Sequence, residues 1–133
     1  MAKPADVLAE RRREREELAA LALGYVERLS RRFPVLAAAV VGSVARGDFN
    51  VWSDVDVVVV AEGLPARAPD RAALLAADAP ARVQAVGFTP AELQDALRRR
   101  NRIAREAVEA GIVLAGADVL RRAALAQRSR STG

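Results

Sequence analysis

Two aspartates, Asp54 and Asp56, stand one residue apart where a β-branched apolar run begins, in the segment SDVDVVVVA. Alternate residues of a β-strand point to the same face, so a strand beginning here would hold the two carboxylates side by side. Without compensation the charges would repel, and one carboxyl group would keep a proton. A divalent cation between them removes that repulsion, and magnesium prefers carboxylate oxygens as ligands. The pair therefore predicts a magnesium site.

A glycine-rich turn precedes the aspartates, in the segment VGSVARG. Gly42 closes an apolar run and lets the chain turn sharply, because it has no Cβ atom. Ser43 is expected to cap a short helix over 44–46, whose backbone amides would attract phosphate. Arg46 is expected to add a bidentate phosphate contact, and Gly47 permits a second bend. The segment therefore predicts a phosphate-binding turn.

The turn and the acidic pair meet if the strand that ends near Gly42 pairs antiparallel with the strand that begins at Val55. The end of one strand then lies beside the start of the other. A nucleoside triphosphate could be held by its phosphates at Ser43, with magnesium bridging to Asp54 and Asp56. Phosphoryl and nucleotidyl transfer depend mostly on such positioning and charge neutralisation.

Three other features of the sequence have less specific roles. Ser53 is expected to cap or orient the start of the strand, with direct nucleotide contact as the alternative. Trp52, the sole tryptophan, is expected to pack against the loop, with stacking on a base as the alternative. The arginine-rich run 98–105 is expected to form a solvated helix face or a partner surface, because no aromatic residues are interleaved with it. Nucleic acid is therefore not an expected partner.

The rest of the chain supplies the elements that must position these residues. Apolar residues at helical spacing, short apolar runs and a capping box from Thr89 to Glu92 mark them. The sequence predicts helices over about 5–32, 69–78, 89–111 and 117–127, strands over 35–42, 55–61 and 82–88, and a frayed polar tail over 128–133. This order implies a single α/β (α+β) domain over 1–133, with a small mixed sheet flanked by helices.

Composition excludes several kinds of chemistry. The 133 residues include no cysteine and no histidine, which rules out disulfides, thiolate zinc sites and any Cys or His nucleophile or base. No apolar run approaches the roughly 20 residues of a membrane helix, so no membrane contact is expected and a cytoplasmic protein is the default. The net charge of +4 is modest, and a single lysine among 21 basic residues indicates a GC-rich bacterial source.

The segment GSVARGDFNVWSDVDVVVV, residues 42–60, resembles the signature of the DNA polymerase beta-like nucleotidyltransferase superfamily, in particular its minimal branch. The resemblance implies the palm-like fold, ATP or another NTP at Gly42 and Ser43, and two magnesium ions (or manganese) at the catalytic Asp54 and Asp56. It also implies transfer of a nucleoside monophosphate to a hydroxyl acceptor with release of pyrophosphate. In bacteria, minimal members often pair with a small helical HEPN-domain protein as a toxin–antitoxin module, and some modify that partner with AMP.

One position departs from the family pattern. Active members usually carry a third carboxylate on a later strand, and the matching position here is Gln84, with no Asp or Glu over 79–91. Its loss should weaken the metal that activates the attacking hydroxyl more than the metal on the triphosphate. Two main hypotheses stay open: a transferase whose acceptor is a hydroxyl, for example on a partner protein, and a catalytically impaired nucleotide-binding antitoxin-like module for a HEPN-type partner. A third and weaker one is a nucleic-acid-binding protein that uses the arginine-rich helix. The charged start of the first helix is expected to serve association, with a second copy or another chain.

Overall fold

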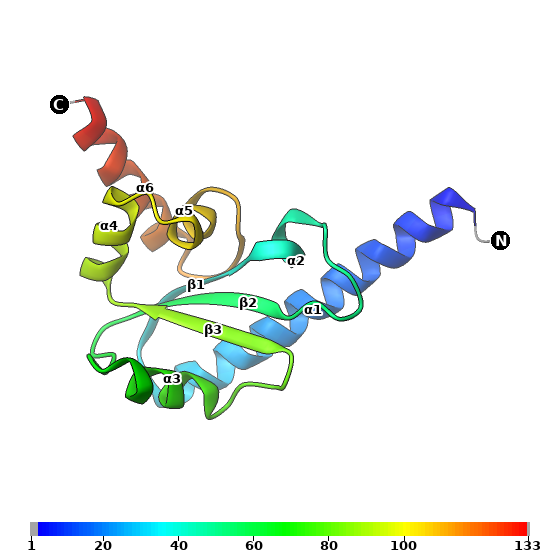
Figure 1. The fold of residues 1–133 in the computed structure, drawn as a ribbon, viewed down its shortest axis with the longest axis horizontal. Coiled ribbons are helices and arrows are strands. Elements are labelled where there is room, and N and C mark those ends of the chain that lie inside the picture. Colours follow the sequence, from blue (N-terminus) through cyan, green and yellow to red (C-terminus); the bar gives the residue numbers. More distant parts are fainter. Residues whose placement is uncertain (1–2, 133) are drawn as a thin grey trace.

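The computed structural model describes residues 3–132, which form a sheet covered by helices on both sides (Figure 1). The helices are α1 (Pro4–Arg32), α2 (Gly42–Arg46), α3 (Ala68–Ala76), α4 (Pro90–Arg98), α5 (Arg102–Glu109) and α6 (Ala117–Thr132). The strands are β1 (Val35–Val41), β2 (Val55–Ala61), β3 (Val83–Phe88) and β4 (Ile112–Ala115). Among the described residues, no helix combines the length and apolar character needed to cross a membrane.

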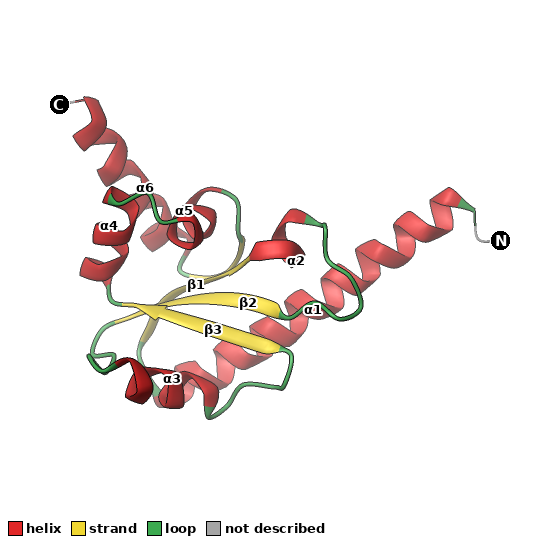
Figure 2. Ribbon diagram, viewed as in Figure 1, coloured by secondary structure: helices red, strands yellow, loops and turns green. Residues whose placement is uncertain are grey.

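The four strands form one mixed sheet in the order β3-β2-β1-β4. β1 pairs antiparallel with both β2 and β4, whereas β2 pairs parallel with β3. The strands and their flanking helices are separated by colour in Figure 2. This arrangement confirms the expected fold class, a small mixed sheet flanked by helices.

Two apolar layers enclose the sheet, and β2 belongs to both. On one face, Tyr25 of α1 and Leu75 of α3 pack with alternate valines of β2. On the other face, Leu93 of α4 and Leu120 of α6 pack with the remaining valines. Within β2, Asp56 is the one exposed residue. The expectation of a central strand covered on both faces is therefore correct, and the strand carries its exposed carboxylate next to its start.

Helix α1 has a buried half and an exposed half. Leu18, Tyr25 and Leu29 are buried against the sheet, as their helical spacing predicts. The Tyr25 hydroxyl donates a hydrogen bond to the Leu75 carbonyl oxygen at 2.6 Å and so ties α1 to α3. Residues 3–10 are exposed, and the helix extends past the sheet toward the N-terminus (Figure 1).

The helix expected over 89–111 is in fact two helices. The chain leaves α4, Arg100 takes a positive φ of 58°, and Asn101 starts α5 by accepting a hydrogen bond from the Ala104 N–H at 3.0 Å. The apolar spacing hid this break because Leu97, before it, and Ala104, after it, are both buried in the same layer. An N-cap inside a continuous apolar pattern is easily overlooked.

The predicted start of α4 is confirmed, whereas the predicted end of α6 is too early. At the start of α4 the capping box is present: Thr89 Oγ1 accepts from the Glu92 N–H at 3.2 Å, and the Glu92 carboxylate accepts from the Thr89 N–H at 2.8 Å. At the other end, α6 continues to Thr132, past the predicted end near Gln127. The tail over 128–132 is thus part of α6, and Gly133 lies outside the described residues.

Strand β4 was not expected from the sequence. It is four residues long and pairs with β1 at one edge of the sheet. Gly116 follows it with a positive φ of 64°, and a Cβ atom there would overlap the Leu36 carbonyl oxygen. A strand this short carries too little periodicity to separate it from the end of a helix.

Candidate functional site

The antiparallel pairing of β1 with β2 brings the glycine-rich turn to the acidic pair. In the register of these strands Val41 faces Asp56, so Gly42 follows directly beside the carboxylate. A Cβ atom on Gly42 would lie 2.6 Å from Asp56 Oδ2, and Gly42 has a positive φ of 73°. The positive φ favours glycine at this position, and any side chain there would displace the Asp56 carboxylate. The expected meeting of the two segments is therefore present.

Helix α2 is built differently from the sequence expectation. It begins at Gly42, and Val41 occupies the N-cap position without a side-chain hydrogen bond. Ser43 therefore lies inside the helix and does not cap it, which corrects the expected role. The Ser43 carbonyl oxygen accepts hydrogen bonds from the N–H groups of Gly47 at 2.8 Å and Asp48 at 3.1 Å. Gly47, at a φ of +88°, supplies the second bend as expected.

Two arginines of α1 hold this turn from behind. Arg15 Nε donates to the Val44 carbonyl oxygen at 2.9 Å, and its guanidinium also donates to Ala45. Arg11 donates to the Phe49 carbonyl oxygen at 2.6 Å, with its guanidinium carbon 4.8 Å from the centroid of the Phe49 ring. Sequence reasoning missed both, because they belong to a segment that is charged on every side.

Asp54 and Asp56 carry negative charge that the protein does not balance directly. Both side chains are exposed, and within residues 3–132 neither carboxylate has a hydrogen-bond or ion-pair partner. Partial burial raises the pKa of Asp56, the carboxylates of Asp54 and Glu106 raise it further, and Arg46 lowers it. A divalent cation would relieve this repulsion, so the two carboxylates fit a hard metal ion.

Gln84 occupies the strand position at which the family pattern has a third carboxylate. It is the register partner of Asp56 in the parallel pairing of β2 with β3, and its side chain is exposed. In the part of the chain that the structure describes, no group of three or more acidic side chains is placed to hold a metal ion. A metal bound to Asp54 and Asp56 would therefore need further ligands from a nucleotide or from water.

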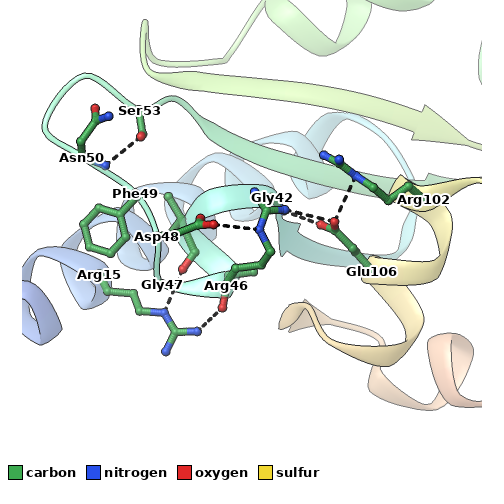
Figure 3. Close-up of polar contacts among 12 residues, drawn as sticks. Arg15, Gly42, Arg46, Gly47, Asp48, Phe49, Asn50, Ser53, Arg102 and Glu106 are labelled. Atoms are coloured by element: carbon green, nitrogen blue, oxygen red, sulfur yellow. Dashed lines mark hydrogen bonds and ion pairs between the residues drawn. The ribbon is translucent and has the colours of Figure 1, made fainter.

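Glu106 of α5 is a member of the site that the sequence did not reveal. Its Oε2 accepts a hydrogen bond from the Gly42 N–H at 2.8 Å, and its Oε1 lies 3.1 Å from Arg46 Nη1 and 3.4 Å from Arg102 Nε. The side chain is only 18% exposed. Figure 3 shows the carboxylate between the turn and α5. Arg46, expected on phosphate, is thus paired with Glu106 and, at 3.3 Å, with Asp48.

The loop before β2 forms its own small turn. Ser53 Oγ accepts a hydrogen bond from the Asn50 N–H at 2.9 Å, and Asn50 Oδ1 accepts one from the Trp52 N–H at 2.8 Å. The Ser53 hydroxyl therefore stabilises the turn that leads into the strand. Trp52 is 88% exposed, so the expectation that it packs against the loop is wrong.

The arginine-rich run 98–105 pairs mostly with carboxylates of its own helices. The ion pairs are Arg98–Asp95, Arg99–Asp95, Arg102–Glu106 and Arg105–Glu109. Side chains paired in this way within a helix are typical of a solvated surface.

Comparison with known proteins adds to this geometry. A sequence profile of the nucleotidyltransferase domain matches residues 24–112, which include the turn, the acidic pair, Gln84 and Glu106. The chain belongs to the nucleotidyltransferase domain family. This nucleotidyltransferase domain is similar in fold to a crystal structure from Sulfolobus solfataricus, of a protein provisionally assigned as a nucleotidyltransferase. The TM-score is 0.60 at 22% identity, over 77% of this chain and 84% of that one. Among curated proteins, none matches the chain.

Proposed function

We propose that this nucleotidyltransferase domain binds ATP or another nucleoside triphosphate with magnesium and transfers the nucleoside monophosphate to a hydroxyl group. The observation that carries the proposal is the register in which Val41 faces Asp56. It sets the Gly42 turn against two carboxylates, Asp54 and Asp56, that have no protein partner among the described residues. A turn suited to phosphate and an acidic pair suited to a cation then adjoin at one end of the sheet.

Each residue would have a distinct part in this reaction. Gly42 and Ser43 would present backbone amides to the triphosphate, and the bare Cα of Gly42 would allow close approach. Asp54 and Asp56 would hold the magnesium ions, and manganese suits the same oxygen ligands. When bound, magnesium neutralises phosphate charge and orients the leaving pyrophosphate. The acceptor oxygen bonds to the α-phosphorus as the bond to the bridging β-oxygen breaks, and the hydroxyl proton leaves to water.

The test uses ATP labelled at the α-phosphate, magnesium, the purified chain and an extract that supplies acceptors. We expect label on an acceptor, and its loss in Asp56→Asn. Asp118→Asn is the matched control, because Asp118 is an exposed carboxylate on α6 paired with Arg121. Absence of Mg·ATP binding in the wild-type chain, or transfer that survives Asp56→Asn, would overturn the proposal.

A second candidate is a catalytically impaired nucleotide-binding module that acts as the antitoxin-like partner of a HEPN-type protein. The observation that favours it is Gln84, an amide at the register position beside Asp56. An amide oxygen carries no charge and cannot take the proton of an attacking hydroxyl. This candidate predicts saturable, Asp56-dependent Mg·ATP binding without transfer, and a stable complex when a HEPN-type protein is co-expressed. Transfer by the wild-type chain would exclude it.

A further inference from the structure

The Glu106 carboxylate engages the Gly42 amide, which the proposed function assigns to the triphosphate, and Arg46, which the sequence predicts to contact phosphate. The Gly42 N–H donates to Oε2 at 2.8 Å, and Arg46 Nη1 lies 3.1 Å from Oε1. A backbone amide and a guanidinium are the donors that recognise phosphate oxygens. The two oxygens of one carboxylate therefore take up donors that two phosphate oxygens would otherwise use.

We propose that Glu106 is an internal competitor of the nucleotide, whose carboxylate must leave the Gly42 amide before a triphosphate can bind there. The proposal rests on the proposed function, because it assumes that the triphosphate binds at the Gly42 turn. It adds that the resting site is closed by a residue of the chain itself, so that nucleotide affinity is set by the balance between two anions.

The Gly42 amide cannot serve Glu106 and a phosphate at the same time. The Gly42 amide has one hydrogen, and it already makes a short, well-formed bond to Glu106. A phosphate oxygen that took this donor would leave two anionic groups side by side, with Asp56 nearby as a third. Like charges so arranged repel. Glu106 and a phosphate therefore exclude one another at Gly42.

The space around the carboxylate agrees with a closed state. Gly42, Asp56, Arg102 and Glu106 all line a cavity of about 120 Å³. Small-molecule sites usually have at least about 300 Å³. Movement of the Glu106 side chain out of this cavity would enlarge it and free the amide in one step.

The position of Arg102 makes such a movement feasible. Arg102 precedes Glu106 by one helical turn on α5 and lies 3.4 Å from its Oε1, and the Arg102 side chain is 79% exposed. A displaced Glu106 can keep this partner while it turns toward solvent. The displaced charge therefore stays neutralised, and Arg46 is released toward the phosphates.

The test is titration calorimetry of a non-hydrolysable ATP analogue with magnesium, and of inorganic tripolyphosphate, against four proteins. These are the wild-type chain, Glu106→Ala, Glu106→Gln and Glu109→Gln. Glu109 is the matched control, because it is an exposed carboxylate on the same helix paired with Arg105. Removal of a charged hydrogen-bond competitor should tighten binding of both probes about tenfold in Glu106→Ala. Glu106→Gln, which keeps an acceptor but no charge, should tighten it less, and Glu109→Gln should equal wild type.

Unchanged or weaker binding in Glu106→Ala would overturn the proposal, and weaker binding would show that the carboxylate supports the turn. Loss of folding in both Glu106 variants, seen by circular dichroism, would overturn it in the same way. Unchanged affinity with lost transfer would assign Glu106 to the chemistry instead. Asp56→Asn separates the two proposals: if wild type binds in an Asp56-dependent manner while Glu106→Ala gains nothing, only the competitor is wrong. If no variant binds either probe, the proposed function fails as well.

Discussion

Asp56 of β2 and Gln84 of β3 are register partners in the parallel part of the sheet. Paired residues on neighbouring strands point to the same face, so the amide of Gln84 lies beside the acidic pair, on the face that α5 covers. A carboxylate at this position would add a third acid to the pair that is proposed to hold magnesium.

Substitution of Gln84 by aspartate is therefore expected to raise nucleotidyl transfer, by at least about tenfold, since a positioned base contributes roughly a hundredfold or more. The measurement is the rate of label transfer from α-labelled ATP at saturating magnesium. Gln84→Asn is the matched control, because it has the same size as aspartate without the charge. Equal rates for the two variants would mean that β3 does not contribute the third ligand position.

Arg15 is expected to matter for nucleotide affinity although it lies behind the turn. Its guanidinium binds two carbonyl oxygens of α2, and Arg15→Ala would leave both without that donor. We expect a loss of about 1 to 3 kcal/mol in the free energy of unfolding and several-fold weaker Mg·ATP binding. Arg12→Ala is the control, since Arg12 is an exposed arginine of the same helix. Denaturant unfolding and calorimetry measure the two effects, and equal behaviour of the two variants would contradict this account.

Gly42→Ala is expected to abolish Mg·ATP binding and to lower stability. The new Cβ atom would lie 2.6 Å from Asp56 Oδ2, at a φ of +73°. Gly63→Ala separates the two causes, because Gly63 has nearly the same φ, +74°, but open space around its Cβ position. Both variants should lose about 1 kcal/mol or more through backbone strain, but only Gly42→Ala should lose binding. Normal binding by Gly42→Ala would show that the acidic pair does not need this close approach.

The free energy of unfolding should fall at alkaline pH because the phenol of Tyr25 is buried. Burial, with a smaller effect of the Asp78 carboxylate, raises the pKa of Tyr25 from 10.0 to about 12. Between these values the unfolded chain releases the proton and the folded chain retains it, so stability falls as pH rises. The contribution is about 2 to 3 kcal/mol across this window.

The variant Tyr25→Phe should be about 1 kcal/mol less stable than wild type near neutral pH, because the hydrogen bond to the Leu75 carbonyl is lost. Its stability should then fall less steeply above about pH 10, since no phenol remains to titrate. Urea midpoints at a series of pH values measure both slopes. Parallel slopes for the two proteins would show that Tyr25 does not titrate on unfolding.

The part of the site that the sequence could predict is local. The acidic pair is recognisable because it lies at the start of an otherwise apolar strand, and the turn is recognisable from Gly42 and Gly47. Their meeting was predicted on the condition that the two strands pair antiparallel, because the end of one strand then lies beside the start of the next. The register of Val41 with Asp56 bears out that step.

The part that could not be predicted depends on charged residues whose partners are remote in sequence. Glu106 is separated from Gly42 by 64 positions, and Arg15 from Val44 by 29. On a helix surface such residues have the same pattern as solvated ones, and only packing of the helix against the turn gives them partners. The prediction that Ser43 caps α2 is wrong for a local reason. The helix begins at Gly42, so the serine lies inside the helix and not at its N-cap.

The buried valines of β2 fix the face of the sheet on which Asp56 lies. A slip of this strand by one position against β1 would carry Asp56 to the opposite face and drive the charge among valines that are inaccessible to solvent. Burial of a carboxylate among apolar side chains costs too much free energy for this slip to occur. Asp56 therefore stays on its face of the sheet as long as the sheet is intact. The turn, in contrast, depends on contacts from helices, since Arg15 of α1 and Glu106 of α5 both bind it.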